Sequence, residues 1–342
     1  MHSDTVVPVD ELDTPAAVVD LDRVDRNLER WQAYCDRVGL ANRPHIKTHR
    51  SVEIARRQVA LGAVGITCQK LGEAEVMAAA GLTDILLAYN LIGAAKLERL
   101  AALLERASIA VTVDDEALLP GLQRAARRGE LGVLVDCDTG DGRTGVPTPE
   151  RAAELARAVE RAGLRFDGYF TFPAPPGAKA FLEAAAGHVS ARVVSVGGTP
   201  GMWEAEELRP TVTEYRAGLY AFHDRASVAA GAATLADVAL TVRATVVSRP
   251  RPGRAILDAG SKALSSDLGP AEGHGTILEA PNAVIEKLSE EHAHVRLEGE
   301  TLELGQQVSV VPNHACVVAN LFDELVVAGG GVVRVDARGR SR

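Results

Sequence analysis

The sequence has little cysteine, and the cysteines it has are scattered. Its 342 residues contain four, Cys35, Cys68, Cys137 and Cys316, and none of them forms a Cys-x-x-Cys pair. This spacing argues against a disulfide framework and fits a reducing compartment.

Two kinds of targeting segment are also missing. The first residues contain no positive n-region followed by an apolar h-region, so we expect no secretory signal. No uncharged apolar run is long enough to span a bilayer. Together with the cysteine spacing, these absences predict a cytoplasmic protein that has no membrane partner.

The chain lacks an excess of basic residues. Its formal net charge of −9 at pH 7 argues against nucleic acid as a partner. A hydrophobic share of 46% and a charged share of 24% are those of an ordinary globular protein, large enough to bury a sizeable core. We expect the short basic segment 336–342 to be a flexible tail.

Strand and helix signals alternate through residues 18–226, which we predict to form one domain. Helical stretches with a period near 3.6 separate short apolar segments, and Thr148-Pro149 is typical of a helix start. With Pro44–Lys47 as the first strand, eight β/α units predict a (β/α)₈ barrel, with a doubly wound α/β fold as the alternative. The other predicted strands are Ala63–Cys68, Asp84–Ala88, Ser108–Val113, Gly132–Asp136, Phe166–Thr171, Arg192–Val196 and Val212–Ala217.

After residue 226 the pattern changes to short β-rich segments, which we predict to form a separate β domain over residues 227–335. Glycine, proline or acidic turns break these segments, among them Val238–Ser248 and Thr301–Leu304. Leu297-Glu298-Gly299-Glu300-Thr301 is typical of a hairpin turn.

Lys47 lies in the segment Arg43-Pro44-His45-Ile46-Lys47-Thr48-His49-Arg50, between a short extended run and a new helix. Nearby cations favour the neutral lysine amine, which is the form that attacks a carbonyl to give a Schiff base. A surface lysine in a basic turn is the alternative, because exposed lysine is the norm. In a barrel, however, Lys47 would end the first strand, at the catalytic end of the fold.

Other polar or glycine-rich positions follow predicted strands at the same end. They are Gln69, Arg143 in the loop Asp138–Gly145, the loop Gly197-Gly198-Thr199, and Tyr220. Backbone amides made accessible by glycine, with the Thr199 hydroxyl, suit a phosphate group. A Schiff-base lysine beside a phosphate site calls for a cofactor such as pyridoxal 5′-phosphate (PLP). Arg143 either pairs with Asp138 or Asp141 or tunes the cofactor ring.

The predicted β domain contains the pair His314-x-Cys316 within Pro312–Cys316. If this segment is extended, the imidazole and the thiol point to the same face. Buried cysteine often simply packs, which is the alternative. As ligands, the two side chains would leave coordination positions for water and substrate. Imidazole with thiolate favours zinc, and manganese or magnesium are alternatives.

Taken together, these residues resemble the alanine-racemase-like, fold-type III PLP enzymes, and among them the D-threonine aldolase/D-serine dehydratase family. The Pro-His-Ile-Lys-Thr-His motif and the distal His-x-Cys are specific together. The resemblance implies a PLP barrel, a β domain of residues 227–335 that also takes in residues 1–17, and a head-to-tail homodimer. The matching segments are Leu12–Pro15, Arg43–Arg50, Val135–Val146, Val196–Thr199, Ile256–Asp267, Leu288–His292 and Pro312–Cys316.

The resemblance also implies roles for single residues. Lys47 would be the PLP lysine, Gln69, Arg143 and Tyr220 would surround the cofactor, Gly198 and Thr199 (after Gly197) would hold its phosphate, and His314 with Cys316 would bind the metal. Two departures stand out. The loop Phe170–Gly177 looks shorter than the family's and lacks its tyrosine or histidine. The second metal ligand is cysteine, as in the zinc dehydratases, where the family's aldolases carry aspartate.

These observations predict a PLP- and metal-dependent lyase acting on a D-β-hydroxy-α-amino acid. Retro-aldol cleavage to glycine and an aldehyde is the first hypothesis, and D-serine-dehydratase-type elimination to a 2-keto acid and ammonia is the alternative. Two weaker hypotheses are an amino-acid racemase, which would need a second acid–base residue and no metal, and a non-catalytic PLP-binding protein, which would resemble the barrel alone.

Overall fold

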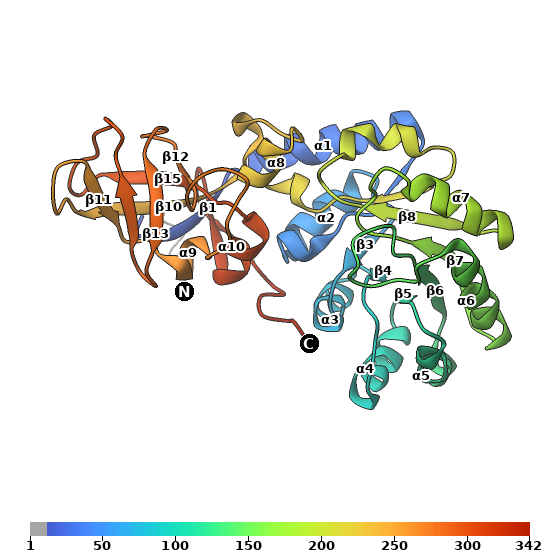
Figure 1. Ribbon diagram of the computed structural model, residues 1–342. Coiled ribbons are helices and arrows are strands. Elements are labelled where there is room, and N and C mark those ends of the chain that lie inside the picture. The colour runs from blue at the N-terminus through green and yellow to red at the C-terminus, as the bar shows by residue number, and fades with distance from the viewer. Residues whose placement is uncertain (1–11) are drawn as a thin grey trace. The chain divides into compact units, whose positions relative to one another are not determined.

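The computed structural model describes residues 12–342 (Figure 1). Two compact units are formed from interleaved parts of the chain. One consists of residues 30–47, 54–218 and 339–342, and the other contains residues 12–29, 48–53 and 219–338. We call them the barrel unit and the β unit. No described helix is long and apolar enough to cross a membrane.

The barrel unit is built on an eight-stranded sheet whose neighbouring strands are all parallel, in the order β2-β9-β8-β7-β6-β5-β4-β3. The first and last strands meet through a parallel bridge between His45 and Thr67 and a bond from the Val64 amide to the Asn42 carbonyl (2.9 Å). The predicted barrel is confirmed. Its strands are β2 (Ala41–Asn42), β3 (Ile66–Cys68), β4 (Asp84–Leu87), β5 (Ser108–Val113), β6 (Leu131–Asp136), β7 (Arg165–Phe170), β8 (Val193–Gly197) and β9 (Glu214–Arg216).

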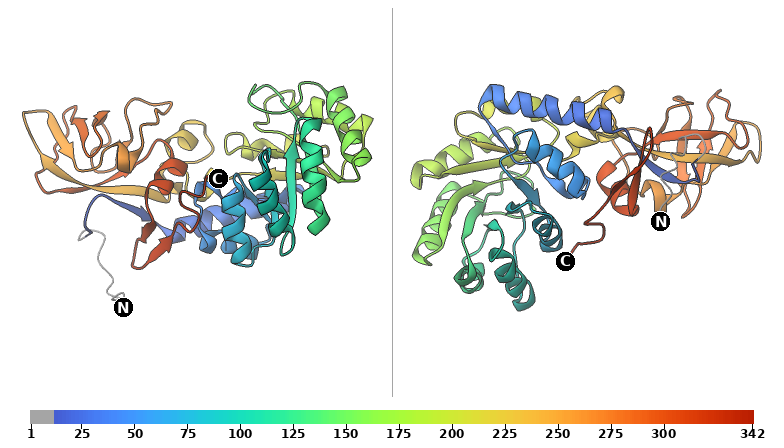
Figure 2. Two further views of the ribbon diagram at one scale, coloured as in Figure 1. Left: turned by 90° about the horizontal axis from the view of Figure 1, so that it is seen from below. Right: turned by 180° about the vertical axis from the view of Figure 1, so that it is seen from behind.

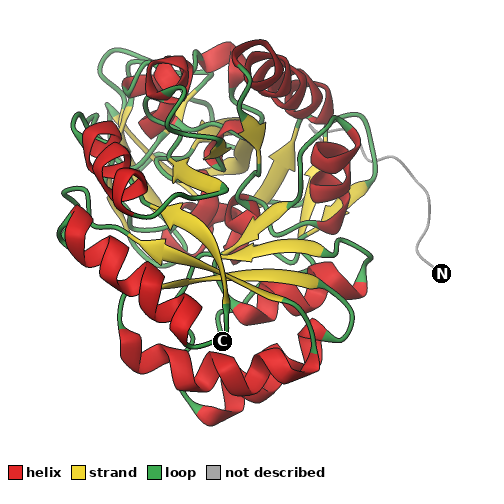
Figure 3. Cartoon of the chain, turned by 90° about the vertical axis from the view of Figure 1, so that its right-hand side faces the viewer, coloured by secondary structure: helices red, strands yellow, loops and turns green. Residues whose placement is uncertain are grey.

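Helices lie around the outside of the strands, as Figure 3 shows. The predicted start at Thr148-Pro149 is confirmed, because the Thr148 hydroxyl accepts the Arg151 amide and Pro149 is the first helical residue. The helices that alternate with the strands are α1 (Leu21–Val38), α2 (Val52–Ala60), α3 (Leu71–Ala79), α4 (Ala94–Leu104), α5 (Leu119–Ala125), α6 (Pro149–Arg161), α7 (Ala178–His188) and the 3₁₀ helix η5 (Met202–Leu208).

Close backbone contact between strands fixes one glycine in the barrel. Gly168 on β7 has φ +152°, and a side chain there would collide with the Val193 carbonyl on β8. Only glycine allows this approach. The apolar residues Leu86, Leu134 and Phe170 pack against one another and form a hydrophobic cluster of the barrel.

The β unit contains a nine-stranded, mostly antiparallel sheet that includes the N-terminal strand. Strand β1 pairs antiparallel with β10 from Ala16↔Arg243 to Val19↔Leu240, which confirms that the N-terminal strand joins this sheet. In Figure 2 this blue strand lies among orange and red ones. The strands are β1 (Ala16–Val19), β10 (Leu240–Ser248), β11 (Arg254–Leu257), β12 (Thr276–Ile277), β13 (Val284–Leu288), β14 (Ala293–Arg296), β15 (Gln307–Val311), β16 (Glu324–Val327) and β17 (Val332–Arg334).

Two predicted strands are wrong. The first barrel strand is Ala41–Asn42, whereas residues 46–48 form the 3₁₀ turn η2 (Ile46–Thr48). Thr301–Leu304 is not a strand, so the turn before it forms but does not join the two strands of a hairpin, because β14 pairs with β11 and β13. In that turn both Glu298 and Gly299 have positive φ, and the Glu300 amide bonds to the Leu297 carbonyl at 2.7 Å. The predicted domain limits and the mobility of residues 336–342 stay predictions.

Candidate active site

Lys47 lies in the turn η2, just beyond the C-terminal end of strand β2. Its backbone N–H donates to Nδ1 of His45 at 3.3 Å, and Nε2 of His45 is 3.1 Å from the Gln69 side-chain oxygen. Because Nδ1 accepts a hydrogen bond, the neutral ring carries its proton on Nε2, which donates a hydrogen bond to the Gln69 side-chain oxygen. The Gln69 amide then donates to the Ala88 carbonyl at 2.8 Å. His45, absent from the predicted site, therefore connects two residues that were in it.

The ring of Phe172 is the point at which three predicted residues meet. The Lys47 Nζ atom is 5.6 Å from its centroid and the Arg143 guanidinium carbon is 4.9 Å from it. A Cβ atom at Gly198 would lie 3.8 Å from the same ring. The loop Phe170–Gly177 thus places an aromatic face, which attracts cations, beside the lysine and the arginine.

Arg143 lies in the loop Asp138–Gly145, which is stabilised by hydrogen bonds between its own residues. The Asp138 carboxylate accepts the amide N–H groups of Gly140, Asp141 and Gly142 at 2.9, 3.0 and 3.1 Å. These bonds hold the pKa of Asp138 below its usual range. Arg143 itself lies 3.6 Å from Asp141, so the ion-pair interpretation holds for that partner. The same side chain also contacts Phe172, so Arg143 can pair with Asp141 and still lie at the candidate site.

The glycine-rich loop after β8, for which the sequence predicts phosphate binding, is held by contacts with β9. Gly198 has φ +131°, a backbone region that favours glycine, and its carbonyl accepts the Tyr215 hydroxyl at 2.9 Å. A Cβ at Gly197 would lie only 3.0 Å from the Arg216 carbonyl oxygen. Thr199 is buried. The loop is therefore held in place from its own unit.

Arg216, on β9, is a charged residue that the sequence interpretation missed. It is buried, donates to the Ser195 hydroxyl at 2.6 Å and to the Thr171 carbonyl at 2.8 Å, and covers the Phe170 ring at 3.6 Å. Ser195 in turn donates to Glu214. The sequence did contain a signal for Arg216. An arginine inside a predicted barrel strand is expected to be buried, and a buried cation requires polar partners.

The other predicted residues belong to the β unit. His314 caps the short helix α10 (Ala315–Leu321), so Cys316 is its second residue, and the extended segment predicted for these positions ends at His314. The two side chains still lie close together. A side-chain hydrogen bond with Cys316 is the largest cause that raises the pKa of His314 to about 9. Tyr220 is buried in the 3₁₀ turn η6 (Leu219–Ala221).

Each part of the His314–Cys316 pair has a partner within the β unit. Nδ1 of His314 is 2.7 Å from an Asp267 carboxylate oxygen, and the Cys316 sulfur is 3.2 Å from the Thr48 hydroxyl. The Ala315 amide donates to the buried Asp224 carboxylate at 2.9 Å. Within residues 12–342, no three His, Cys, Asp or Glu side chains group as a ready metal site.

Known families match both halves of the chain. The alanine racemase N-terminal domain family matches residues 19–226, and a putative serine dehydratase domain matches residues 239–328. D-threonine aldolase of Arthrobacter sp. is 35% identical over 98% of this chain and 95% of its own length. The chain belongs to the D-threonine aldolase/D-serine dehydratase family.

Relatives in this family have different named activities. D-threo-3-hydroxyaspartate dehydratase of Delftia sp. (strain HT23) is also 35% identical, over 94% of this chain and 96% of its own. The crystal structure of D-threonine aldolase from Filomicrobium marinum superposes with a TM-score of 0.86 at 33% identity, covering 98% of both chains. A structure of a cysteine-to-alanine mutant of the dehydratase is described as metal-free. These relatives are lyases, but they break different bonds.

The PLP dependence of the alanine-racemase-like family supports PLP as the cofactor of this family member, and the residues present fit it. A lysine amine, an arginine and a glycine-threonine loop border one ring in the barrel unit. This set supplies an amine for an aldehyde and backbone and hydroxyl donors for a phosphate. The imidazole and thiol of the β unit likewise suit a transition metal.

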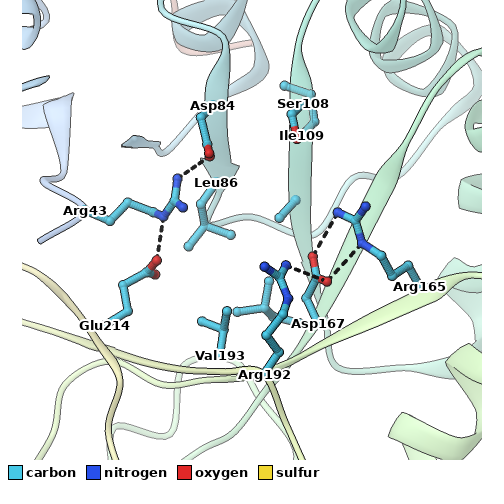
Figure 4. Close-up of a pocket in the computed structure, with 12 residues that line it drawn as sticks. Arg43, Asp84, Leu86, Ser108, Ile109, Arg165, Asp167, Arg192, Val193 and Glu214 are labelled. Atoms are coloured by element: carbon cyan, nitrogen blue, oxygen red, sulfur yellow. Dashed lines mark hydrogen bonds and ion pairs between the residues drawn. The ribbon is translucent and has the colours of Figure 1, made fainter. Parts of the chain in front are cut away.

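A cavity of about 300 Å³ lies at the opposite end of the barrel, where the strands begin (Figure 4). On one side Arg43 lies between Asp84 and Glu214, and on the other Arg165 and Arg192 share Asp167. Because these charges are paired and lie away from the C-terminal strand ends, we assign them to barrel stability.

Asp136, at the C-terminal end of β6, gives the barrel a distinct pH dependence. Burial raises its pKa to about 6, against the lowering effect of the Thr144 hydrogen bond. The folded protein therefore binds more protons than the unfolded chain, and the free energy of unfolding falls as pH rises from about 4 to about 6. The full effect is about 3 kcal/mol.

The variant Asp136→Asn lacks this titration. We expect the unfolding free energy of the natural protein, relative to that of the variant, to fall by about 2.5 kcal/mol between about pH 4 and pH 7. Urea titrations at both pH values measure it. A difference that does not vary with pH would contradict the raised pKa of Asp136.

Proposed function

We propose that the protein is a PLP- and divalent-metal-dependent lyase that cleaves D-β-hydroxy-α-amino acids to glycine and an aldehyde. The observation that carries the metal-dependent part is the contact between the His314 and Cys316 side chains, each held by a further residue. The likeness to D-threonine aldolase over nearly the whole chain supports the reaction. Zinc is the favoured metal, because of the thiolate.

When bound, PLP supplies an electron sink and the metal supplies a Lewis acid. The chain's own residues bind and orient. The Lys47 amine holds the cofactor aldehyde, Gly197, Gly198 and Thr199 donate to its phosphate, and Gln69, Arg143 and Tyr220 surround it. The His314 imidazole and the Cys316 thiolate hold the metal for the substrate's β-hydroxyl. We further propose, from the resemblance, that the protein is a homodimer.

A second reaction has an observation in its favour. The second metal-binding residue is cysteine, as in the zinc dehydratases, and a cysteine mutant of the related 3-hydroxyaspartate dehydratase is described as metal-free. In that reaction the Lys47 amine removes the α-proton and the β-hydroxyl leaves, giving a 2-keto acid and ammonia. Both reactions use the same residues, so the products must decide between them.

The products formed from D-threonine, D-serine and D-threo-3-hydroxyaspartate separate the two reactions. We expect PLP- and zinc-loaded protein to form glycine in each incubation in which it acts, with acetaldehyde from D-threonine and glyoxylate from the hydroxyaspartate. Pyruvate from D-serine, or oxaloacetate from the hydroxyaspartate, with ammonia would show the dehydratase instead. Interconversion of D and L substrate without either set of products would indicate a racemase and contradict the lyase.

A further inference from the structure

We propose that Asp267 and Thr48 are positioning residues that fix the His314–Cys316 pair for metal binding. This inference rests on the proposed function, because the metal itself is part of that proposal. It concerns residues of the β unit only: two ligands, and the two side chains that hydrogen-bond to them.

Asp267 determines which nitrogen of His314 is available. Its carboxylate oxygen lies 2.7 Å from Nδ1, so Nδ1 keeps its proton when a metal displaces the proton from Nε2 and binds there. The carboxylate also makes the imidazole a stronger electron-pair donor to a metal, as carboxylate partners of metal-binding histidines do. Asp267 thus acts on the metal through His314.

Thr48 has the corresponding relation to Cys316. The threonine is buried, and its hydroxyl oxygen lies 3.2 Å from the sulfur. A metal-bound cysteine is a thiolate and can only accept, so the hydroxyl must donate to it. One such bond restricts the rotation of the cysteine side chain. Thr48 also shares the three-residue turn η2 with Lys47. The hydroxyl that orients the sulfur and the lysine of the proposed cofactor site thus lie on adjacent residues.

The backbone between the two ligands is fixed by a third group. The Ala315 amide donates to Asp224, whose fully buried carboxylate also accepts the Ser227 amide at the start of α8 (Arg225–Ala229). With the backbone held in this way, the remaining freedom of the pair is the rotation of its two side chains. Those are the rotations that Asp267 and Thr48 restrict.

The exposure of the two residues makes the proposal testable. The side chains of His314 and Asp267 are 43% and 46% exposed, so their pairing contributes little to stability, and replacing Asp267 should not unfold the protein. Thr48 is buried, but valine has the same shape and serine keeps the hydroxyl. The informative set is Asp267→Ala, Thr48→Val and Thr48→Ser. Glu291→Gln is the control, since Glu291 is an exposed acid of the same unit bonded to Lys262.

The test measures Co²⁺ binding to the PLP-loaded protein, following the sulfur-to-cobalt charge-transfer absorbance. We expect Asp267→Ala and Thr48→Val each to weaken Co²⁺ binding by about 10-fold or more, the range found for partners of metal ligands. Thr48→Ser should bind nearly as the natural protein does, and Glu291→Gln should bind identically. Circular dichroism establishes that each variant is folded.

Two negative results differ in meaning. If the natural protein binds Co²⁺ through sulfur and both variants bind it equally well, the positioning roles are wrong while the metal site stands. If the natural protein itself shows no sulfur-to-cobalt absorbance, then the metal site of the proposed function fails, and the positioning roles fail with it. Weakening in Thr48→Ser equal to that in Thr48→Val would also contradict the role of the hydroxyl.

Discussion

Replacing Lys47 by alanine is expected to abolish the visible absorbance that PLP acquires when a lysine of the protein binds it, together with lyase activity. Lys47 is the lysine whose Nζ lies beside the Phe172 ring, close to Arg143 and the loop containing Gly198. The variant loses both the attachment point and a proton-transfer group, so activity should fall by at least about 10³-fold. Absorbance spectra and product assays measure the two losses.

A lysine elsewhere in the barrel unit provides the control. Lys179, on α7, donates to the Glu207 carbonyl at 3.0 Å. Lys179→Ala should keep both the absorbance and the activity. If Lys47→Ala retained the visible band, a different lysine would bind the cofactor, and the assignment of the site would be wrong.

Replacing Cys316 by alanine is expected to remove the bound metal and to reduce lyase activity by about 10²-fold or more, because the Lewis acid at the β-hydroxyl is lost. The PLP absorbance should remain, since Lys47 is unchanged. Metal analysis of the purified variant and activity with added Zn²⁺ provide the measurements. Treatment of the natural protein with a chelator should give the same loss, reversed by metal.

The matched control is His292→Ala, which removes an exposed histidine of the same unit. Its metal content and activity should be unchanged. Full lyase activity of chelator-treated protein, or of Cys316→Ala without metal, would contradict the metal dependence of the proposed lyase. Restoration by Zn²⁺, Mn²⁺ or Mg²⁺ would show which ions support the reaction.

Much of the fold could be predicted because local signals agree with the tertiary structure. The Thr148-Pro149 start of α6 and the paired Glu298-Gly299 turn are set by short-range geometry. Local sequence patterns gave the wrong secondary structure where it depends on residues far away in the chain. Pro44–Lys47 was predicted to be a short extended strand, but the chain turns at Ile46–Thr48. Thr301–Leu304 has no paired neighbour in the sheet, so its alternating pattern does not produce a strand.

The candidate site shows the same division. Lys47, Arg143 and Gly198 could be named from sequence because each follows a barrel strand, and the structure brings all three to Phe172. Asp267 could not be linked to His314, since the two are 47 residues apart and only the folded β unit brings them together. His314 and Cys316 were paired through an extended segment, whereas their contact arises at the start of a helix.

The central claim is that Lys47 binds PLP, and its most direct test is chemical. Borohydride treatment of the PLP-loaded protein fixes the cofactor to its lysine as a stable secondary amine, and peptide mass spectrometry then locates the added mass. We predict that it lies on the peptide containing Lys47, and that Lys47→Ala protein carries none. Modification of a different lysine, or of none, would contradict the account.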